Sequence, residues 1–306
     1  MTITDSRVAD ALKGRIVAVL NTASGGWDAH AEGRAREIFA AAGLTHAEVT
    51  SVPPGEIDAA LTKAVGGADV LVVLGGDGTI RTAAARCAGF SGFLVPLPGG
   101  TMNMLPKALY GARAWPEALA DTLANPEIHH VSGGKAGEHA FFVAALLGGP
   151  TLWADAREAV RAGHLIEAAK RAVTAARRSY SEPLDYEFGD TLRGSAEAVA
   201  VVCPLISKVM NEDERMLEAA AIDPETAGET LRLGFHALFD GWRADPTVKR
   251  AKVRRLRVTG HGGVPVIVDG EKVRMGRVVD ITFTPLAFRA LIPARQEETS
   301  DPPAAP

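Results

Sequence analysis

The sequence predicts a two-domain protein: an N-terminal α/β domain with a doubly wound parallel sheet, then a C-terminal β-sandwich with an added long helix. Up to about residue 128, short apolar runs alternate with helical stretches, which is typical of a parallel sheet with helices on both faces. Beyond that point, strand-like segments follow one another without such helices, as in a sandwich. The length of 306 residues also favours two domains over one. The predicted divisions are 1–128, 129–293 and a disordered tail, 294–306.

The central feature is a buried strand predicted at residues 69–74, followed by a glycine turn. The run is apolar, rich in β-branched residues and too short for an ordinary helix. Gly75, Gly76 and Gly78 allow a tight turn with no Cβ to obstruct a ligand, and a helix is predicted from Thr79. The free N–H groups and dipole at the start of a helix attract anions. The sequence therefore predicts a phosphate site here.

Asp77 is the one carboxylate in this turn. It either caps the following helix or has a functional role, and its spacing alone leaves both interpretations open. The turn fits neither of two common phosphate-binding patterns. It lacks the lysine of a P-loop, and Arg81 stands where the third glycine of a Rossmann fingerprint belongs.

Two further turns follow predicted strands of the same domain. The strand at 15–20 runs into a polar glycine turn at 21–26, and the strand at 92–95 runs into a turn at 96–103. Parallel strands place their carboxyl ends at one edge of the sheet, where open α/β sheets bind their ligands. We therefore expect the three turns to lie together.

The second domain contains the sequence Val-Asp-Gly-Glu at residues 268–271. Asp269 and Glu271 flank Gly270 at the end of a predicted strand, which by itself indicates an Asp-Gly hairpin turn with an incidental glutamate. The other interpretation is a pair of functional carboxylates. The predicted strands of this domain are 139–147, 196–203, 230–233, 256–259, 264–268 and 278–283, and the long helix is 152–178.

These motifs together resemble the superfamily of diacylglycerol kinases, sphingosine kinases and NAD kinases. GGDGT at 75–79 is its signature, and NTASGG at 21–26 is similar to its Asn-Pro-x-Ser-Gly turn, with Thr22 in place of proline. The segment 96–103 is similar to the Pro-x-Gly-Thr-x-Asn turn. The late Asp-Gly-Glu is similar to a turn that folds over the cleft in the lipid kinases.

This resemblance implies ATP- and Mg²⁺-dependent phosphorylation of a lipid hydroxyl, such as that of diacylglycerol, in a cleft between the domains. Glu271 is expected to accept the proton, Asp269 to help place it, and Asp77 to act on the Mg²⁺–phosphate side. In the sphingosine-kinase branch the central aspartate is itself proposed as the base, so Glu271 and Asp77 both remain candidates. The expected nucleotide contacts are Asn21, Ser24, Gly25, Gly75, Gly76, Gly78, Thr79, Gly100, Thr101 and Asn103.

The sequence also departs from the family pattern. Arg81-Thr82 replaces Asn-Glu after GGDGT, Met104-Leu105 replaces Asp-Phe, and no Asp-Gly-x-Leu-Asp segment for a structural Mg²⁺ is legible. Two alternatives therefore stay open. One is NAD kinase-like activity, although the third turn and Asp-Gly-Glu are more similar to the lipid branch. The other is a catalytically inactive homologue that binds nucleotide or lipid.

Composition limits the partners and the compartment. A net charge of −4 argues against nucleic-acid binding, and two cysteines fit a reducing compartment. No apolar run reaches the ~20 residues needed to span a bilayer, so a cytoplasmic location is expected, and a homodimer is left open. A basic run is either a solvated face or a contact for an anionic membrane surface, at about 1 kcal/mol per basic residue. It consists of Lys249, Arg250, Lys252, Arg254, Arg255 and Arg257.

Overall fold

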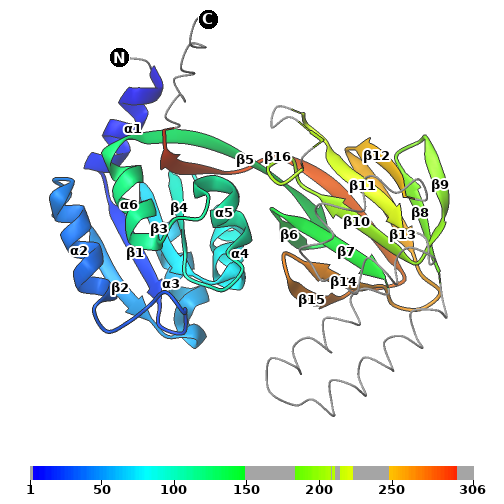
Figure 1. The fold of residues 1–306 in the computed structure, drawn as a ribbon, viewed down its shortest axis with the longest axis horizontal. Helices are drawn as coiled ribbons and strands as arrows, with labels where there is room; N and C mark the ends of the chain where they lie inside the picture. The colour runs from blue at the N-terminus through cyan, green and yellow to red at the C-terminus, as the bar shows by residue number, and fades with distance from the viewer. Residues whose placement is uncertain (1–2, 149–182, 208, 211–213, 223–247, 295–306) are drawn as a thin grey trace, which may run out of the picture. The chain divides into compact units, whose positions relative to one another are not determined.

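The computed structural model describes residues 3–148, 183–207, 209–210, 214–222 and 248–294, and it divides into two compact units. Unit 1 is Met1–Gly76, Phe90–His129 and Arg289–Pro306, and unit 2 is Asp77–Gly89 and His130–Phe288 (Figure 1). The predicted division after residue 128 lies next to one of the points where the chain passes between units. The predicted tail lies outside the described residues, except for Ala294.

Unit 1 contains the parallel sheet. Its strands are β1 (Ile16–Asn21), β2 (Glu48–Val52), β3 (Val70–Gly75) and β4 (Phe93–Pro98), paired in parallel in the order β2-β1-β3-β4. The last part of β16 (Val278–Pro293) pairs with β4. β1 and β3 are buried along their whole length, because helices cover both faces of a sheet of this kind. The predicted parallel α/β domain is confirmed.

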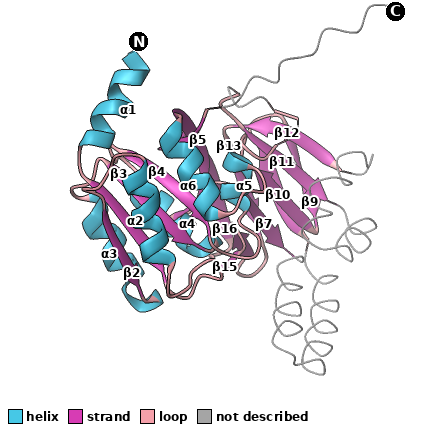
Figure 2. Ribbon diagram, turned by 60° about the vertical axis from the view of Figure 1, so that its left-hand side comes forward, coloured by secondary structure: helices cyan, strands magenta, loops and turns pink. Residues whose placement is uncertain are grey.

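The helices of unit 1 lie on both faces of this sheet (Figure 2). The connections β1 to β2 and β2 to β3 run in opposite directions along the sheet, so right-handed crossovers place α2 and α3 on opposite faces. Helix α6 packs beside α2. The helical elements are α1 (Ile3–Lys13), α2 (Ala31–Ala41), the 3₁₀ turn η1 (Pro54–Glu56), α3 (Ile57–Val65), α5 (Met104–Tyr110) and α6 (Trp115–Ala124).

Unit 2 contains helix α4 (Asp77–Arg86) and a β-sandwich. One sheet has the strand order β16-β13-β8-β9, and the other has the order β12-β11-β10-β7-β14-β15. Buried side chains of both sheets form one core that includes Tyr186, Phe188 and Val201, so the predicted sandwich is confirmed. Its strands are β5 (Pro126–Ala136, starting in unit 1), β6 (His139–Phe141), β7 (Ala144–Gly148), β8 (Leu184–Phe188), β9 (Leu192–Ala196), β10 (Ala198–Val202), β11 (Leu217–Ile222), β12 (Lys249–Val253), β13 (Arg255–Thr259), β14 (Pro265–Val268) and β15 (Glu271–Arg274).

One predicted strand, 139–147, is two strands in the structure. β6 ends at Phe141 and β7 begins at Ala144. Between them, the backbone N–H groups of Phe142 and Val143 donate to the carboxylate of Asp269 at 2.8 and 2.9 Å. A side chain more than a hundred residues away therefore interrupts an apolar run that contains no strand-breaking residue.

Some predicted elements lie outside the described residues, namely the long helix 152–178 and the strand 230–233. No helix in the described ranges is long and apolar enough to cross a membrane.

Candidate active site

The three glycine turns of unit 1 meet at Gly99. The N–H of Gly99 donates to the carbonyl of Gly75 at 2.9 Å, and the carbonyl of Gly99 accepts from Gly26 N at 2.9 Å and from Ser24 Oγ at 2.8 Å. A Cβ at position 99 would lie only 3.0 Å from the backbone N and O of Gly75 and would also meet Ser24 Oγ. Glycine at this position therefore lets the carboxyl ends of β1, β3 and β4 join.

Several side chains predicted to contact a nucleotide shape these turns. Asn21 Oδ1 accepts from Ala23 N at 3.0 Å. The amide of Asn103 accepts from Gly100 N at 2.6 Å and donates to Gly100 O at 2.7 Å, and Asn103 itself is left-handed, with a φ of 50°. Asparagine tolerates this conformation better than most residues. These contacts hold the turns in shape, and direct nucleotide contacts by these residues stay a prediction.

Helix α4 begins immediately after the central turn, at Asp77 rather than at the predicted Thr79. Asp77, Gly78 and Thr79 thus form its first turn, where backbone N–H groups have no partner within the helix. All three residues are partly exposed. A positive, partly exposed helix end suits a phosphate group.

The Asp-Gly-Glu segment is a two-residue hairpin turn between β14 and β15. Val268 pairs with Glu271, and the two residues between them, Asp269 and Gly270, have φ values of 47° and 88°. Positive φ at both central positions defines a type I′ turn, for which Asp-Gly is a preferred sequence. The simpler expectation for this segment, a hairpin turn, is therefore confirmed.

Asp269 anchors this turn from inside the sandwich. Its side chain is 5% exposed, and its carboxylate accepts N–H groups from Phe142, Val143 and Ala144 at 2.8–2.9 Å. Burial raises the pKa of Asp269 to about 6, while these donors and the charge of Arg81 act in the opposite direction. Both oxygens of Asp269 are thus engaged in fixing the hairpin to the start of β7.

Glu271 lies over the start of α4. Its Oε2 pairs with the guanidinium of Arg81, and its Oε1 occupies the space into which a Cβ on Gly78 would project. The side chain of Glu271 is 44% exposed and that of Arg81 is 18% exposed. Gly78 from the central turn and Glu271 from the hairpin, both in unit 2, are therefore brought into direct contact.

Sequence reasoning did not identify Arg81 as part of this arrangement. The available signal was its position, two residues after GGDGT, where the resemblance implies asparagine. In the structure, the guanidinium of Arg81 pairs with Glu271, the residue expected to act as the base.

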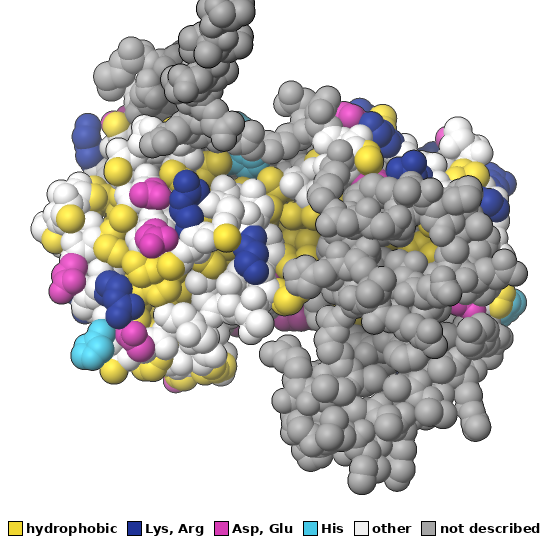
Figure 3. Space-filling model, in the orientation of Figure 1, with side chains coloured by type: hydrophobic (Ala, Val, Ile, Leu, Met, Phe, Trp, Pro, Cys, Tyr) yellow, Lys and Arg dark blue, Asp and Glu magenta, His cyan; other side chains and the backbone are white. Residues whose placement is uncertain are grey.

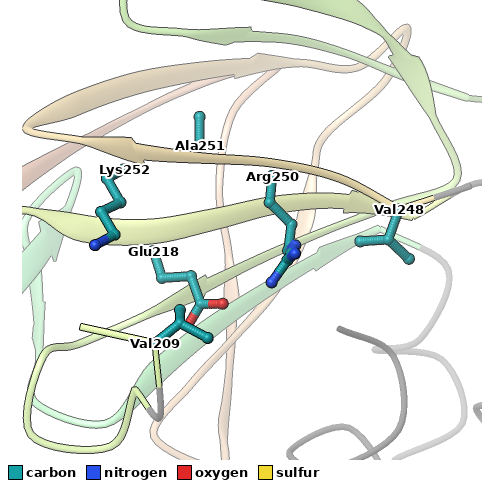
Figure 4. A pocket seen from close by; sticks show the side chains of 6 residues that line it. All are labelled: Val209, Glu218, Val248, Arg250, Ala251 and Lys252. Carbon is teal, nitrogen blue, oxygen red and sulfur yellow. The ribbon is translucent and has the colours of Figure 1, made fainter. Parts of the chain in front are cut away.

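Unit 2 also contains a cavity of about 430 Å³ (Figure 4). It adjoins β11 and β12, and the nearly buried carboxylate of Glu218 accepts from Ser207 Oγ at 2.6 Å. None of the predicted site residues lines it. The lining residues are Val209, Glu218, Val248, Arg250, Ala251 and Lys252.

Metal ligands are sparse in the part of the chain that the structure describes. It contains no group of three or more His, Cys, Asp or Glu side chains placed to hold an ion. A Mg²⁺ site does not need such a group, because one or two carboxylates together with substrate phosphates often bind this ion. Asp77, in the first turn of α4, fits that more modest requirement.

Comparison with known proteins agrees with this architecture. Residues 15–136 match the model of the diacylglycerol kinase catalytic domain, which confirms the family resemblance seen in the turns. A diacylglycerol kinase structure from Bacillus anthracis str. Sterne has a TM-score of 0.67 at 16% identity, covering 91% of this chain and 97% of that one. A second protein from this organism, provisionally named a diacylglycerol kinase, has a TM-score of 0.71 at 18% identity, with the same coverage. At such identities the likeness shows the fold, and no curated protein sequence matches the chain.

Proposed function

We propose that this protein transfers the γ-phosphoryl group of ATP to the hydroxyl of a lipid, diacylglycerol or a related amphiphile. The observation that carries the proposal is the position of Glu271 above Gly78, in the first turn of α4. A proton acceptor thus stands beside a helix N-terminus suited to phosphate. The match of residues 15–136 to the diacylglycerol kinase catalytic domain supports this reaction type and this acceptor class.

The proposed chemistry assigns separate tasks to the two oxygens of Glu271. Oε2 is paired with Arg81, so Oε1, the oxygen beside Gly78, is the one that accepts the proton of the lipid hydroxyl. The lipid oxygen forms a bond to the γ-phosphorus as the bond to ADP breaks, in an in-line displacement. The proton goes to Glu271, and ADP leaves with the electron pair of the broken bond.

Asp77 would hold Mg²⁺ together with phosphate oxygens. The ion neutralises charge on the phosphates when it is bound. Asp77 and Arg81 are four residues apart on α4, which places them on the same side of the helix. The carboxylate for the metal and the cation that holds Glu271 therefore come from successive turns of one rigid element.

We propose that access to the lipid comes from docking on an anionic membrane surface. The basic run lies on β12, on β13 and at Arg254 between them, and basic side chains are visible over this part of unit 2 in Figure 3. Lys252 pairs with Glu214 at 2.6 Å, and Arg257 pairs with Asp280 at 2.7 Å. Arg255 is 3.7 Å from Asp190. Such pairing lowers the charge that a membrane would meet.

The three other cations of the run are better candidates for the membrane contact. Lys249, Arg250 and Arg254 are exposed, and none of them forms an ion pair within the described residues. Each can gain about 1 kcal/mol near an anionic surface.

The proposal is tested by phosphoryl transfer from labelled ATP with Mg²⁺ to diacylglycerol, sphingosine and other lipid alcohols in vesicles, and to NAD as a separate acceptor. Label in a lipid phosphate supports the proposal. Label in NADP with none in lipid supports the NAD kinase alternative. Binding of ATP or lipid with no transfer to any acceptor supports a catalytically inactive homologue.

A further inference from the structure

Arg81 is a cation that interacts with both carboxylates of the hairpin. Its guanidinium pairs with Glu271 Oε2, and the negative charge of Asp269 also acts on it. Its Nε atom is buried and has no hydrogen-bond partner among the described residues. Burial lowers the pKa of Arg81, and the charge of Asp269 raises it.

The Arg81–Glu271 pair contributes little to the stability of the fold. Burying a guanidinium with an unsatisfied N–H is unfavourable, and the partner carboxylate, on Glu271, is 44% exposed. Pairs with an exposed member contribute little net stability. What the pair does achieve is geometric, because it restrains a flexible glutamate side chain directly over Gly78.

Glu271 is therefore fixed at two levels. Its backbone is fixed by the I′ turn, which Asp269 ties to the start of β7. Its carboxylate is fixed by Arg81 from α4. The turn fixes the position of the Glu271 backbone, and Arg81 fixes the position of the Glu271 carboxylate.

We propose that Arg81 is a positioning residue that holds the Glu271 carboxylate over Gly78. The inference rests on the proposed function, because a restrained carboxylate is what a proton acceptor requires. It also assigns a role to a residue at which this chain departs from the pattern of the family that it resembles.

The other charged groups near Glu271 belong to three elements. Asp77 lies one helical turn before Arg81, and Asp269 lies two residues before Glu271 in the hairpin. Lys272 follows in β15, where alternation directs its side chain to the opposite face. Arg81 is thus the described cation that directly contacts the Glu271 carboxylate.

The first test uses lipid phosphorylation by Arg81→Gln and Arg81→Lys, with Arg86→Gln as the matched control on the exposed side of the same helix. For Arg81→Gln we expect kcat to fall about 10²-fold, because misplacing a catalytic group by about 1 Å costs that much. We expect KM for ATP to stay within about threefold of the wild-type value. The acid limb of the kcat profile should move about one unit to higher pH, and lysine should restore that limb. If Arg81→Gln has the same kcat and the same acid limb as the wild type, the inference is overturned.

The second test does not depend on kinase activity. Carboxyl ¹³C NMR of glutamate-labelled protein follows the titration of Glu271, assigned by its loss in Glu271→Gln. Removing the cation in Arg81→Gln should move the titration midpoint up by about one pH unit, and Arg86→Gln should not move it. An unmoved midpoint in Arg81→Gln overturns the inference whether or not the chain is a kinase. A moved midpoint in a protein that transfers no phosphate supports the Arg81–Glu271 contact and overturns the proposed function alone.

Discussion

Replacing Gly78 with alanine should displace the Glu271 carboxylate without destabilising the fold. The added methyl group would occupy the space of Glu271 Oε1 and lie 3.4 Å from its Cδ, with no backbone atom of another described element within 4 Å. The carboxylate is the end of a flexible, half-exposed side chain, so it can move aside at low energetic cost. We therefore expect the protein to fold normally with Glu271 displaced.

The expected magnitudes follow from these contacts. Alanine in place of glycine in a helix stabilises by about 0.5–1 kcal/mol, and loosening a half-exposed ion pair costs up to about 1 kcal/mol. The free energy of unfolding in urea should thus change by less than about 1 kcal/mol. Displacing the base by about 1 Å should lower kcat about 10²-fold, with ATP affinity by calorimetry nearly unchanged.

Gly33→Ala provides the matched control. Gly33 also lies in the first turn of a helix, α2, and is exposed. Apart from its chain neighbours and the backbone of its own helix, no atom of the described residues lies within 4 Å of a Cβ added there. The same substitution at this position should stabilise slightly and leave kcat unaltered. A Gly78→Ala enzyme with wild-type kcat would refute the claim that the carboxylate over Gly78 acts in catalysis.

The remaining predictions concern the nucleotide, the buried aspartate and the membrane. A Cβ at Gly76 would lie 3.7 Å from Gly100 Cα, an ordinary contact. Gly76→Val should therefore fold yet weaken ATP binding at least about tenfold by calorimetry, and unchanged affinity would contradict the phosphate site. The folded-state pKa of Asp269, about 6, exceeds the ordinary value, so its protonation stabilises the fold at low pH and this contribution is lost as pH rises through 6. The stability of the wild type relative to Asp269→Asn should thus fall by about 2 kcal/mol between pH 4 and pH 7, and a flat difference in chemical denaturation would oppose it. The Lys249→Glu/Arg254→Glu double variant and added salt should each weaken co-sedimentation with anionic vesicles, whereas binding that ignores both would indicate a solvated face.

The parts of the fold that could be predicted from sequence are those encoded locally. The apolar runs that became β1 and β3 lead into glycine turns, and both faces of each strand are buried, so composition alone identifies them. The Asp269-Gly270 pair predicts its own turn, because few residues adopt positive φ at both positions. The three turns could be expected to meet because their strands are parallel.

The parts that could not be predicted depend on contacts distant in sequence. Nothing between residues 139 and 147 indicates the break after Phe141, because Asp269 imposes it from the turn between β14 and β15. Helix α5 contains Pro106, which obscures its pattern, yet it forms next to β4. Arg81 could be recognised only as an exception to a pattern. Its partner, Glu271, is 190 residues away, and the chain fold alone brings them together.

The most direct test of the central claim is the rate of label transfer from ATP to diacylglycerol in vesicles, measured for the wild type and for Glu271→Gln. Glutamine keeps the size of the side chain but cannot accept the proton at neutral pH. We predict measurable Mg²⁺-dependent transfer by the wild type and a kcat about 10²–10⁴-fold lower in Glu271→Gln, with ATP affinity preserved. Normal turnover by Glu271→Gln, together with loss of turnover in an Asp77→Asn variant that still binds ATP, would contradict the account by assigning the base to Asp77.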